Sequence, residues 1–206
     1  MIAPTQTTLP PLDDYADWML WTDRAETAQA QFVGALLYDT LHPTSVVDWG
    51  CASGLYLVPF RERGCTVFGL DGENEAGKQL PRANFWRRDL RQWVYLPLWF
   101  DLALCIEVAE HLQPKYADTL VENVARSADM VFWSAAVPGQ HGLCHYNEQP
   151  WEYWYAKWKA QGFDLHPLND AVRAAIAEHP DCLRWLKNNA RLLVRGGEHE
   201  QTYQDV

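Results

Sequence analysis

The sequence predicts a doubly wound α/β fold, with seven strands in a mostly parallel sheet and helices on both faces. Hydrophobic segments of strand length alternate along the chain with segments whose hydrophobic residues recur at helical spacing. The strand segments are nearly continuous hydrophobic runs, which is typical of strands that are buried on both faces. Strands and helices that alternate in this way pack as a parallel sheet between two layers of helices.

The first 135 residues contain one helix and then alternating strands and helices. Residues 1–20 include Pro4, Pro10 and Pro11, so we expect the chain to begin as an irregular arm. The elements predicted after it are a helix through 32–41 that ends before Pro43, strands over 45–49, 65–70, 84–86, 100–106 and 130–135, and helices over 55–63 and 116–128.

The last third begins with a loop over 137–149 and continues with an aromatic helix. Trp151, Trp154, Tyr155 and Trp158 recur at helical spacing. We interpret this aromatic stripe as packing against the sheet, not as a platform on which nucleic-acid bases stack. Short strands over 163–166 and 190–194 enclose a helical stretch that is broken at Pro180.

Charge and cysteine content narrow the classes of function. The net charge of −10 makes a nucleic-acid partner unlikely, because proteins that follow phosphate backbones normally present a basic face. No apolar run approaches the roughly 18 residues of a membrane helix, and residues 1–11 lack the features of a secretory signal. Five scattered cysteines without a CxxC pair indicate a reducing compartment, so we expect a cytoplasmic protein without a disulfide framework.

The clearest indication of a binding site lies in residues 46–54. A hydrophobic strand there carries an acidic residue near its end, and a turn of small residues connects it to a helix. Its key positions are Asp48, Gly50, Ala52 and Gly54. Small residues at such a turn let a ligand approach the backbone closely. A nicotinamide-binding fingerprint needs a third glycine where this chain has Leu55, so a dinucleotide cofactor is not expected.

This segment resembles motif I of the class I S-adenosylmethionine-dependent methyltransferases, which have a Rossmann-like fold. The resemblance implies that the key positions of the turn line the cofactor, that Asp71 binds its ribose hydroxyls, and that Asp89 and the backbone of Leu90 bind its adenine. Ala52 stands where the family has glycine, a mild departure if its backbone conformation is ordinary.

The resemblance also predicts how the chain is organised. It implies an antiparallel strand at one edge of the sheet and one domain over 1–206. Within that domain we expect an arm and helix over 1–43, a cofactor-binding core over 44–135 and an acceptor side over 136–206.

A second group of candidate site residues follows the strand over 100–106. It lies at the carboxyl edge of the predicted parallel sheet, where such sheets bind ligands. Glu107, Glu110 and His111 resemble the E-x-x-E-H element of two O-methyltransferase groups, one acting on small-RNA 3′ ends and one in ubiquinone biosynthesis. In both groups the element is associated with a divalent metal that holds two oxygens of the substrate. The resemblance implies a site for Mn, Mg, Co or Zn made by these residues and His145, with His141 as the second choice for the last ligand; the mixed oxygen and nitrogen donors suit Mg least.

A metal-free interpretation of the same residues stays open. Glu107 then caps a helix or contacts the cofactor, His111 lines the cofactor cleft and His145 is a general base, because an unperturbed pKa of ~6.5 suits that task. On both interpretations His145, His111 and Glu107 are the candidate catalytic residues.

The function expected is O-methylation of a hydroxyl on a small molecule or sugar, with no membrane partner. Methylation of a nucleic-acid or protein end is an alternative that the net charge disfavours. A non-catalytic, cofactor-binding partner subunit is a second alternative, and the acceptor-side acids and histidines argue against it. The sequence does not indicate an oligomeric state.

Overall fold

The computed structural model describes residues 15–73 and 76–196, with side chains from residue 26 onwards. The helices are α1 (Tyr15–Leu41), α2 (Val58–Glu62), α3 (Ala117–Ala125), α4 (Trp151–Ala160), α5 (Asn169–Glu178) and α6 (Arg184–Asn189). The strands are β1 (Ser45–Trp49), β2 (Thr66–Asp71), β3 (Phe85–Arg87), β4 (Phe100–Ile106), β5 (Ala128–Ser134), β6 (Phe163–Leu165) and β7 (Arg191–Arg195). Four 3-10 turns lie at η1 (Leu55–Leu57), η2 (Arg82–Asn84), η3 (Ala109–His111) and η4 (Pro114–Tyr116).

The strands form one seven-stranded sheet in the order β3-β2-β1-β4-β5-β7-β6. β1 pairs in parallel with β2 and β4, β2 with β3, and β4 with β5. β7 runs antiparallel to both β5 and β6. The predicted mostly parallel sheet is confirmed, and its antiparallel strand lies one position inside the edge that β6 forms.

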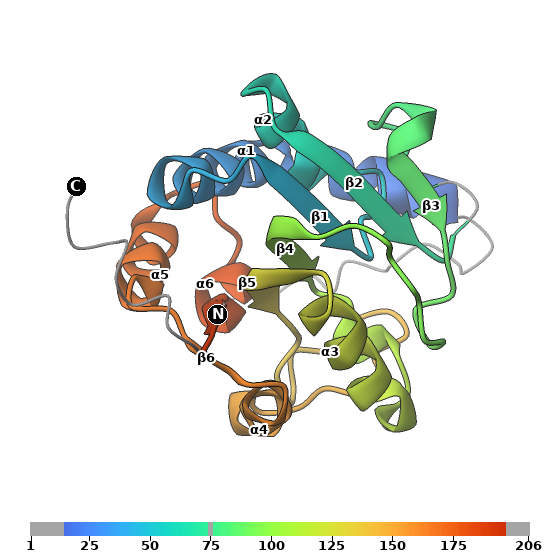
Figure 1. Cartoon of the computed structure of the whole chain (residues 1–206), viewed down its shortest axis with the longest axis vertical. Coiled ribbons are helices and arrows are strands. Elements are labelled where there is room, and N and C mark those ends of the chain that lie inside the picture. Colours follow the sequence, from blue (N-terminus) through green and yellow to red (C-terminus); the bar gives the residue numbers. More distant parts are fainter. Residues whose placement is uncertain (1–14, 74–75, 197–206) are drawn as a thin grey trace, which may run out of the picture.

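Helices cover both faces of this sheet, with α1 and α2 on one side and α3 and α4 on the other (Figure 1). Successive residues of a strand point to opposite faces, so each strand contributes to two cores. In β4, Leu102 and Leu104 pack in the core under α1 and α2, whereas Ala103 and Cys105 pack in the core under α3 and α4. Burial on both faces explains why the strands are hydrophobic throughout, and it confirms the doubly wound arrangement.

The aromatic stripe of α4 is part of the core. Trp154 and Trp158 are buried, and their rings lie 5.3 Å and 5.2 Å from the ring of Trp133 on β5. Trp151 stacks on Tyr155 at the outer side of the stripe. The packing interpretation of these residues is confirmed for the two buried tryptophans.

The first helix is longer than the sequence predicts. Residues 15–20, expected to belong to an irregular arm, are part of α1, because the prolines that indicated the arm end at Pro11 and nothing after them interrupts a helix. Residues 1–14 of the expected arm lie outside the described residues. The helix ends at Leu41, before His42 (φ +49°) and Pro43, as predicted.

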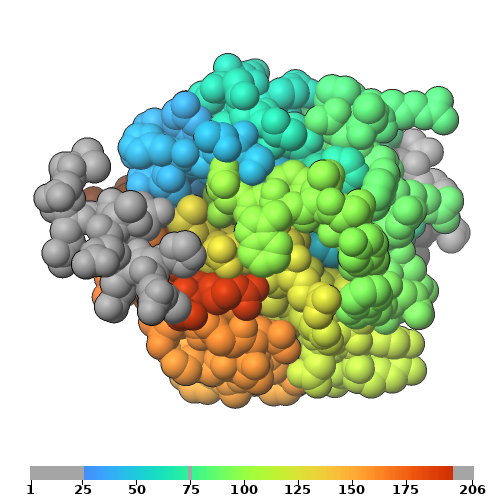
Figure 2. All heavy atoms as spheres, in the orientation of Figure 1, coloured from blue at the N-terminus to red at the C-terminus, as the bar shows by residue number. Residues whose placement is uncertain are grey.

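Segments from the beginning and the end of the described chain lie next to each other at the molecular surface. Figure 2 shows residues of the first half, in blue to green, above residues of the last third, in orange to red. Within the described ranges, no helix has the length and hydrophobicity needed to cross a membrane. The five cysteines are free thiols.

Candidate active site

The turn after β1 adopts left-handed backbone conformations. Gly50 and Gly54 have φ angles of +83° and +92°. A Cβ on Gly50 would lie 2.4 Å from Val108, and one on Gly54 would lie 2.7 Å from Leu80. Both positions therefore need glycine for conformation and for space. The turn lies at the carboxyl edge of the parallel strands, where ligands bind in sheets of this type.

Ala52, at the centre of this turn, also has a left-handed conformation, with φ +46°. The condition under which alanine is a mild departure from the family's glycine, an ordinary backbone conformation, is therefore not met. Its N–H donates to Asp71 Oδ2 at 2.9 Å, and its carbonyl accepts from Gly77 N at 2.7 Å, so the surrounding chain imposes the conformation. For a residue with a Cβ this conformation costs about 1–2 kcal/mol.

Asp48 and Asp71 lie close to the same turn. Asp48 is 3% exposed, and its burial, followed by the neighbouring Asp71, raises its pKa to about 8. Burial also raises the pKa of Asp71, opposed by backbone N–H donors that include Glu73 at 2.9 Å. A carboxylate can accept about four hydrogen bonds, so Asp71 keeps acceptor capacity for a ligand.

Asp89 lies two residues after β3 and is exposed. Both of its oxygens accept hydrogen bonds from the guanidinium of Arg91, at 2.8 and 2.9 Å, and these bonds lower the pKa of Asp89. Leu90 is buried, and within the described residues its N–H has no protein acceptor. The roles of both residues in adenine binding stay predictions, and a ligand at Asp89 has to share the carboxylate with Arg91.

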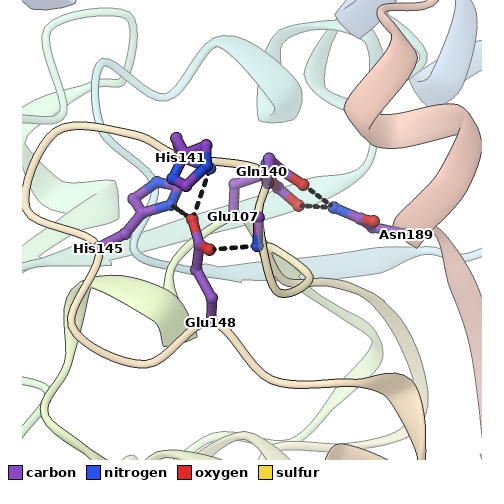
Figure 3. Close-up of polar contacts among 7 residues, drawn as sticks. Glu107, Gln140, His141, His145, Glu148 and Asn189 are labelled. Carbon is purple, nitrogen blue, oxygen red and sulfur yellow. Dashed lines mark hydrogen bonds and ion pairs between the residues drawn. The ribbon is translucent and has the colours of Figure 1, made fainter.

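Glu107 follows β4 with a left-handed backbone (φ +51°), a strained conformation that occurs often at functional sites. Its N–H donates to the carbonyl of Ser134 at 3.0 Å. Its carboxylate accepts from Gln140 Nε2 at 2.7 Å and from Asn189 Nδ2 at 3.1 Å. Figure 3 shows these three side chains as one hydrogen-bonded group that joins the end of β4, the loop after β5 and the end of α6.

Glu110, in η3, is fully buried, and neither carboxylate oxygen has a hydrogen-bond partner within the described residues. Burial raises its pKa well above the usual value, and the nearby Glu107 raises it further, while the backbone of Glu110 and Ala136 opposes the increase. The backbone carbonyl of Glu110 accepts from the N–H groups of Tyr146 and Asn147 at 2.8 and 3.1 Å. These two bonds fix the loop that carries His145 against η3.

The structure brings three of the four predicted metal ligands together. Ligand atoms of Glu110, His111 and His145 all lie within 4.8 Å of one another, and the two imidazole rings are 4.9 Å apart. Burial, followed by His145, lowers the pKa of His111 to about 4, so its imidazole is neutral at pH 7. The structure does not bring Glu107 or His141 into this group.

Glu148 organises the loop around His145, a role that the sequence analysis missed. Its Oε1 lies 2.8 Å from His145 Nδ1 and accepts the backbone N–H of His141 at 2.7 Å, while Oε2 accepts that of Gly139 at 2.8 Å (Figure 3). With a proton on Nδ1, the other ring nitrogen of His145 has a free lone pair. The sequence feature that could have indicated this contact is that Glu148 follows His145 by three residues.

Because Gly142 has no side chain, it leaves room for the edge of the His145 ring that carries Nε2. A Cβ on this residue would lie 2.2 Å from His145 Nε2. Gly142, His145 and Glu148 line a polar hollow at the surface together with His141 and the exposed Tyr146. The imidazole of His145 is thus partly accessible from the surface.

The chemistry of the three clustered side chains fits a divalent cation. A buried carboxylate without a partner is costly, and a cation relieves that cost. One carboxylate and two imidazoles suit Zn, Mn or Co, and a site with three protein ligands keeps positions open for a substrate. The orphaned oxygens of Glu110 are the feature that a bound ion would use, together with ring nitrogens of His111 and His145 within 4.8 Å.

Comparisons with known proteins bear on the family and the fold of the chain. Residues 20–166 match the family model of a methyltransferase domain, which is more than half of the chain. No curated protein sequence matches the chain.

Three solved structures share the fold at low sequence identity. The sugar N-methyltransferase KedS8 from Streptoalloteichus has a TM-score of 0.67 and 15% identity over 96% of this chain and 99% of its own. DesVI from Streptomyces venezuelae has a TM-score of 0.66 and 14% identity over 91% and 100%. The magnesium protoporphyrin IX methyltransferase of Synechocystis, solved with bound S-adenosylhomocysteine, has a TM-score of 0.62 and 19% identity over 89% and 94%.

Proposed function

This chain belongs to the methyltransferase domain family and is an S-adenosylmethionine-dependent methyltransferase, and we propose that it methylates a hydroxyl of a small-molecule or sugar acceptor with the help of a divalent cation. The acidic surface, at a net charge of −10, supports a small acceptor over a nucleic-acid end. We place the activity in the cytoplasm, because five free thiols are in keeping with a reducing compartment.

The observation that carries the proposal is the buried carboxylate of Glu110. Its two oxygens have no hydrogen-bond partner among the described residues, and nitrogens of His111 and His145 lie within 4.8 Å. Burying an acid without a hydrogen-bond partner lowers the stability of the fold. A ligand that binds this acid is therefore the simplest explanation for its burial. We propose that Glu110, His111 and His145 hold a divalent cation.

Each residue of the cluster has a separate task in this proposal. When bound, a divalent cation lowers the pKa of an acceptor hydroxyl and fixes its direction. Glu110 supplies the negative charge, and the neutral His111 supplies a lone pair. Glu148 holds His145 so that Nε2 faces the site, while Gln140 and Asn189 hold Glu107 beside it.

The hydrogen bond between Glu148 and His145 favours a second candidate mechanism. A carboxylate that orients an imidazole is the usual partner of a general base. In a metal-free site, His145 Nε2 takes the proton of the acceptor hydroxyl and Glu148 stabilises the imidazolium. Glu110 then has no role that explains its burial, which is why we place this mechanism second.

On the cofactor side, we propose that the turn over 50–54 and Asp71 bind S-adenosylmethionine, with Asp89 and Leu90 at its adenine. Asp71→Ala removes charge-assisted bonds worth about 1.5–3 kcal/mol, so the dissociation constant should rise roughly 10–100-fold. Calorimetry with S-adenosylhomocysteine measures this, with Asp181→Ala on the exposed surface as the control. Unchanged affinity would show that Asp71 does not contact the ligand.

The acceptor chemistry is tested by methylation of cell-extract compounds with isotopically labelled S-adenosylmethionine. We expect a product with one added methyl group on oxygen, no product in EDTA, and recovery with Mn²⁺ or Co²⁺. Fragmentation spectra distinguish methylation on oxygen from methylation on nitrogen. A product that forms at full rate in EDTA would contradict the metal while leaving the methyltransferase intact, and a methylated amine would contradict the hydroxyl acceptor.

A further inference from the structure

The connection between β3 and β4 is a loop that presents hydrophobic side chains to solvent (Figure 1). Residues 92–100 contain no charged residue. Within them, Trp93, Tyr95, Leu98 and Trp99 are between 51% and 69% exposed, and these four residues form the hydrophobic patch. The described residues include seven large hydrophobic side chains that are exposed, and four of them lie in this one short segment. Such a group of neighbours indicates an interaction surface, whereas scattered exposed side chains do not.

The backbone of the hydrophobic patch is held in place by the core and by α3. Val94 and Leu96, which alternate with exposed residues of the patch, are partly buried and pack against the core. The N–H of Val94 donates to Asn123 Oδ1 at 2.9 Å, and Asn123 Nδ2 donates to the carbonyl of Gln92 at 2.8 Å. A segment that is ordered before it binds loses less conformational freedom on association, so the patch is prepared for contact.

The two ends of the hydrophobic patch have the same composition. Each end combines a tryptophan, an arginine over its ring and an acid beside the arginine. These residues are Trp93, Arg126 and Glu122 at one end and Trp99, Arg195 and Asp129 at the other. The arginine Cζ atoms lie 5.4 and 5.9 Å from the ring centres, and the arginine nitrogens lie 3.9 and 2.8 Å from the acid oxygens. Positive and negative charges are therefore balanced at both ends.

We propose that the hydrophobic patch binds the same patch on a second copy of this chain, related to the first by a two-fold axis through the middle of the patch. In a two-fold contact a surface pairs with itself, so the Trp93 end of one copy meets the Trp99 end of the other. Each arginine then approaches the acid of the partner. The charge balance lets two chains of net charge −10 associate here, and it leaves no excess positive charge to bind an anionic membrane or a nucleic acid.

The extent of the hydrophobic patch fits the centre of an ordinary dimer interface. Each partner in such an interface contributes about 800 Å², arranged as a hydrophobic core with a polar rim. Three aromatic side chains and one leucine, each more than half exposed, supply roughly 400 Å² of that area. The two arginines and their acids supply part of the rim. Tryptophan, tyrosine and arginine are also the residues that contribute most to binding energy at interfaces.

Sedimentation equilibrium of the full chain over a range of concentrations tests this inference. We expect a species of twice the 23.7 kDa of one chain at about 100 μM, because interfaces of this size dissociate in the micromolar range or below. Trp99→Ser should weaken the dimer roughly 10–100-fold, as the loss of an aromatic anchor predicts. Leu168→Ser, at an exposed hydrophobic residue outside the patch, is the matched control and should dimerise like the parent.

Charged residues at Tyr95 test the two-fold arrangement itself. Tyr95 lies near the middle of the patch, so Tyr95→Glu or Tyr95→Lys places like charges across the axis and should abolish the dimer. An equimolar mixture of the two variants should form the dimer again, because opposite charges then meet. Tyr95 is 69% exposed, so neither substitution should unfold the chain, and circular dichroism checks this.

These measurements need neither cofactor nor acceptor, so their outcome is independent of the proposed function. A parent chain that stays monomeric at every concentration would overturn the inference. A dimer that persists in Tyr95→Glu, or a mixture of the two Tyr95 variants that stays monomeric, would also overturn it. Binding of a monomeric parent chain to vesicles of phosphatidylcholine and phosphatidylglycerol would assign the hydrophobic patch to a membrane surface instead.

Discussion

Acids on the two sides of the site differ in their hydrogen bonding. On the cofactor side, Asp71 accepts hydrogen bonds from the backbone of the turn that it supports, and Asp89 accepts two from Arg91. On the acceptor side, Glu110 is fully buried and its oxygens have no partner within the described residues. Asp71 and Asp89 therefore have protein partners, whereas Glu110 has none among the described residues, and the proposed cation would supply one.

The hydrogen bonding of an acid indicates whether the acid stabilises the fold or is kept at a cost in stability for its function. Acids that are satisfied by backbone or arginine stabilise the fold and remain able to bind a ligand. An acid that is buried without a partner destabilises the fold, and proteins keep such groups where the chemistry needs them. The comparison therefore predicts that replacing Glu110 will lose activity and gain stability, and that replacing Asp71 will not show this combination.

The largest effect is expected for Glu110→Met. This variant should lose metal binding and at least ~10³-fold in turnover, since a metal contributes several kcal/mol to catalysis. It should also be more stable than the parent without metal, by about 1–3 kcal/mol, because it removes an unpaired buried carboxyl. Urea unfolding and turnover measure the two effects, with Glu178→Met on the exposed side of α5 as the control. A variant that is less stable and still active would remove the basis of the comparison.

Gly142→Ala tests the acceptor side without touching a ligand residue. The new Cβ would overlap His145 Nε2 and force the ring to move, so metal affinity and kcat should each fall roughly 10–100-fold. The free energy of unfolding should change little, because the hollow leaves room for the displaced ring. Gly196→Ala, which meets only an ordinary contact, is the control. Parent-like activity of Gly142→Ala would mean that Nε2 does not face the site.

Asp48 makes the cofactor side sensitive to pH. Its pKa of about 8 in the folded state exceeds that of an unfolded chain, ~3.9, so the folded state binds more protons between these values. The free energy of unfolding should therefore fall as pH rises from about 4 to 8, by at most ~1.4 kcal/mol per pH unit for this group. Asp48→Asn should flatten that dependence in urea titrations at several pH values. An equally steep dependence in the variant would show that other groups cause it.

The smallest effect is expected at Ala52. Ala52→Gly releases the left-handed strain but increases the freedom of the unfolded chain, for a net gain of about 0.5–1 kcal/mol in stability. Thermal denaturation should show a Tm about 1–4 °C higher. Ala83→Gly, at an exposed position whose φ is not left-handed, should lower stability instead. A lower Tm for Ala52→Gly would contradict the strain.

The sequence predicted the strand ends and the turn over 46–71 better than the contacts around Glu107, and the physical reason is locality. The turn over 50–54 and the strand ends at Asp48 and Asp71 follow from periodicity and spacing within short segments. The contacts of Glu107 with Gln140 and Asn189 join residues far apart in the chain, so no local pattern reports them. The left-handed φ of Ala52 was missed because a neighbouring strand, through Asp71, imposes it.

The central claim is that the acceptor side is completed by a divalent cation. Anomalous scattering from crystals soaked in Mn²⁺, with S-adenosylhomocysteine bound, tests it most directly. The account predicts one strong peak bounded by Glu110, His111 and His145, and none in crystals of Glu110→Met. A parent crystal without a peak at these residues, from protein that methylates its acceptor at full rate in EDTA, would contradict the claim.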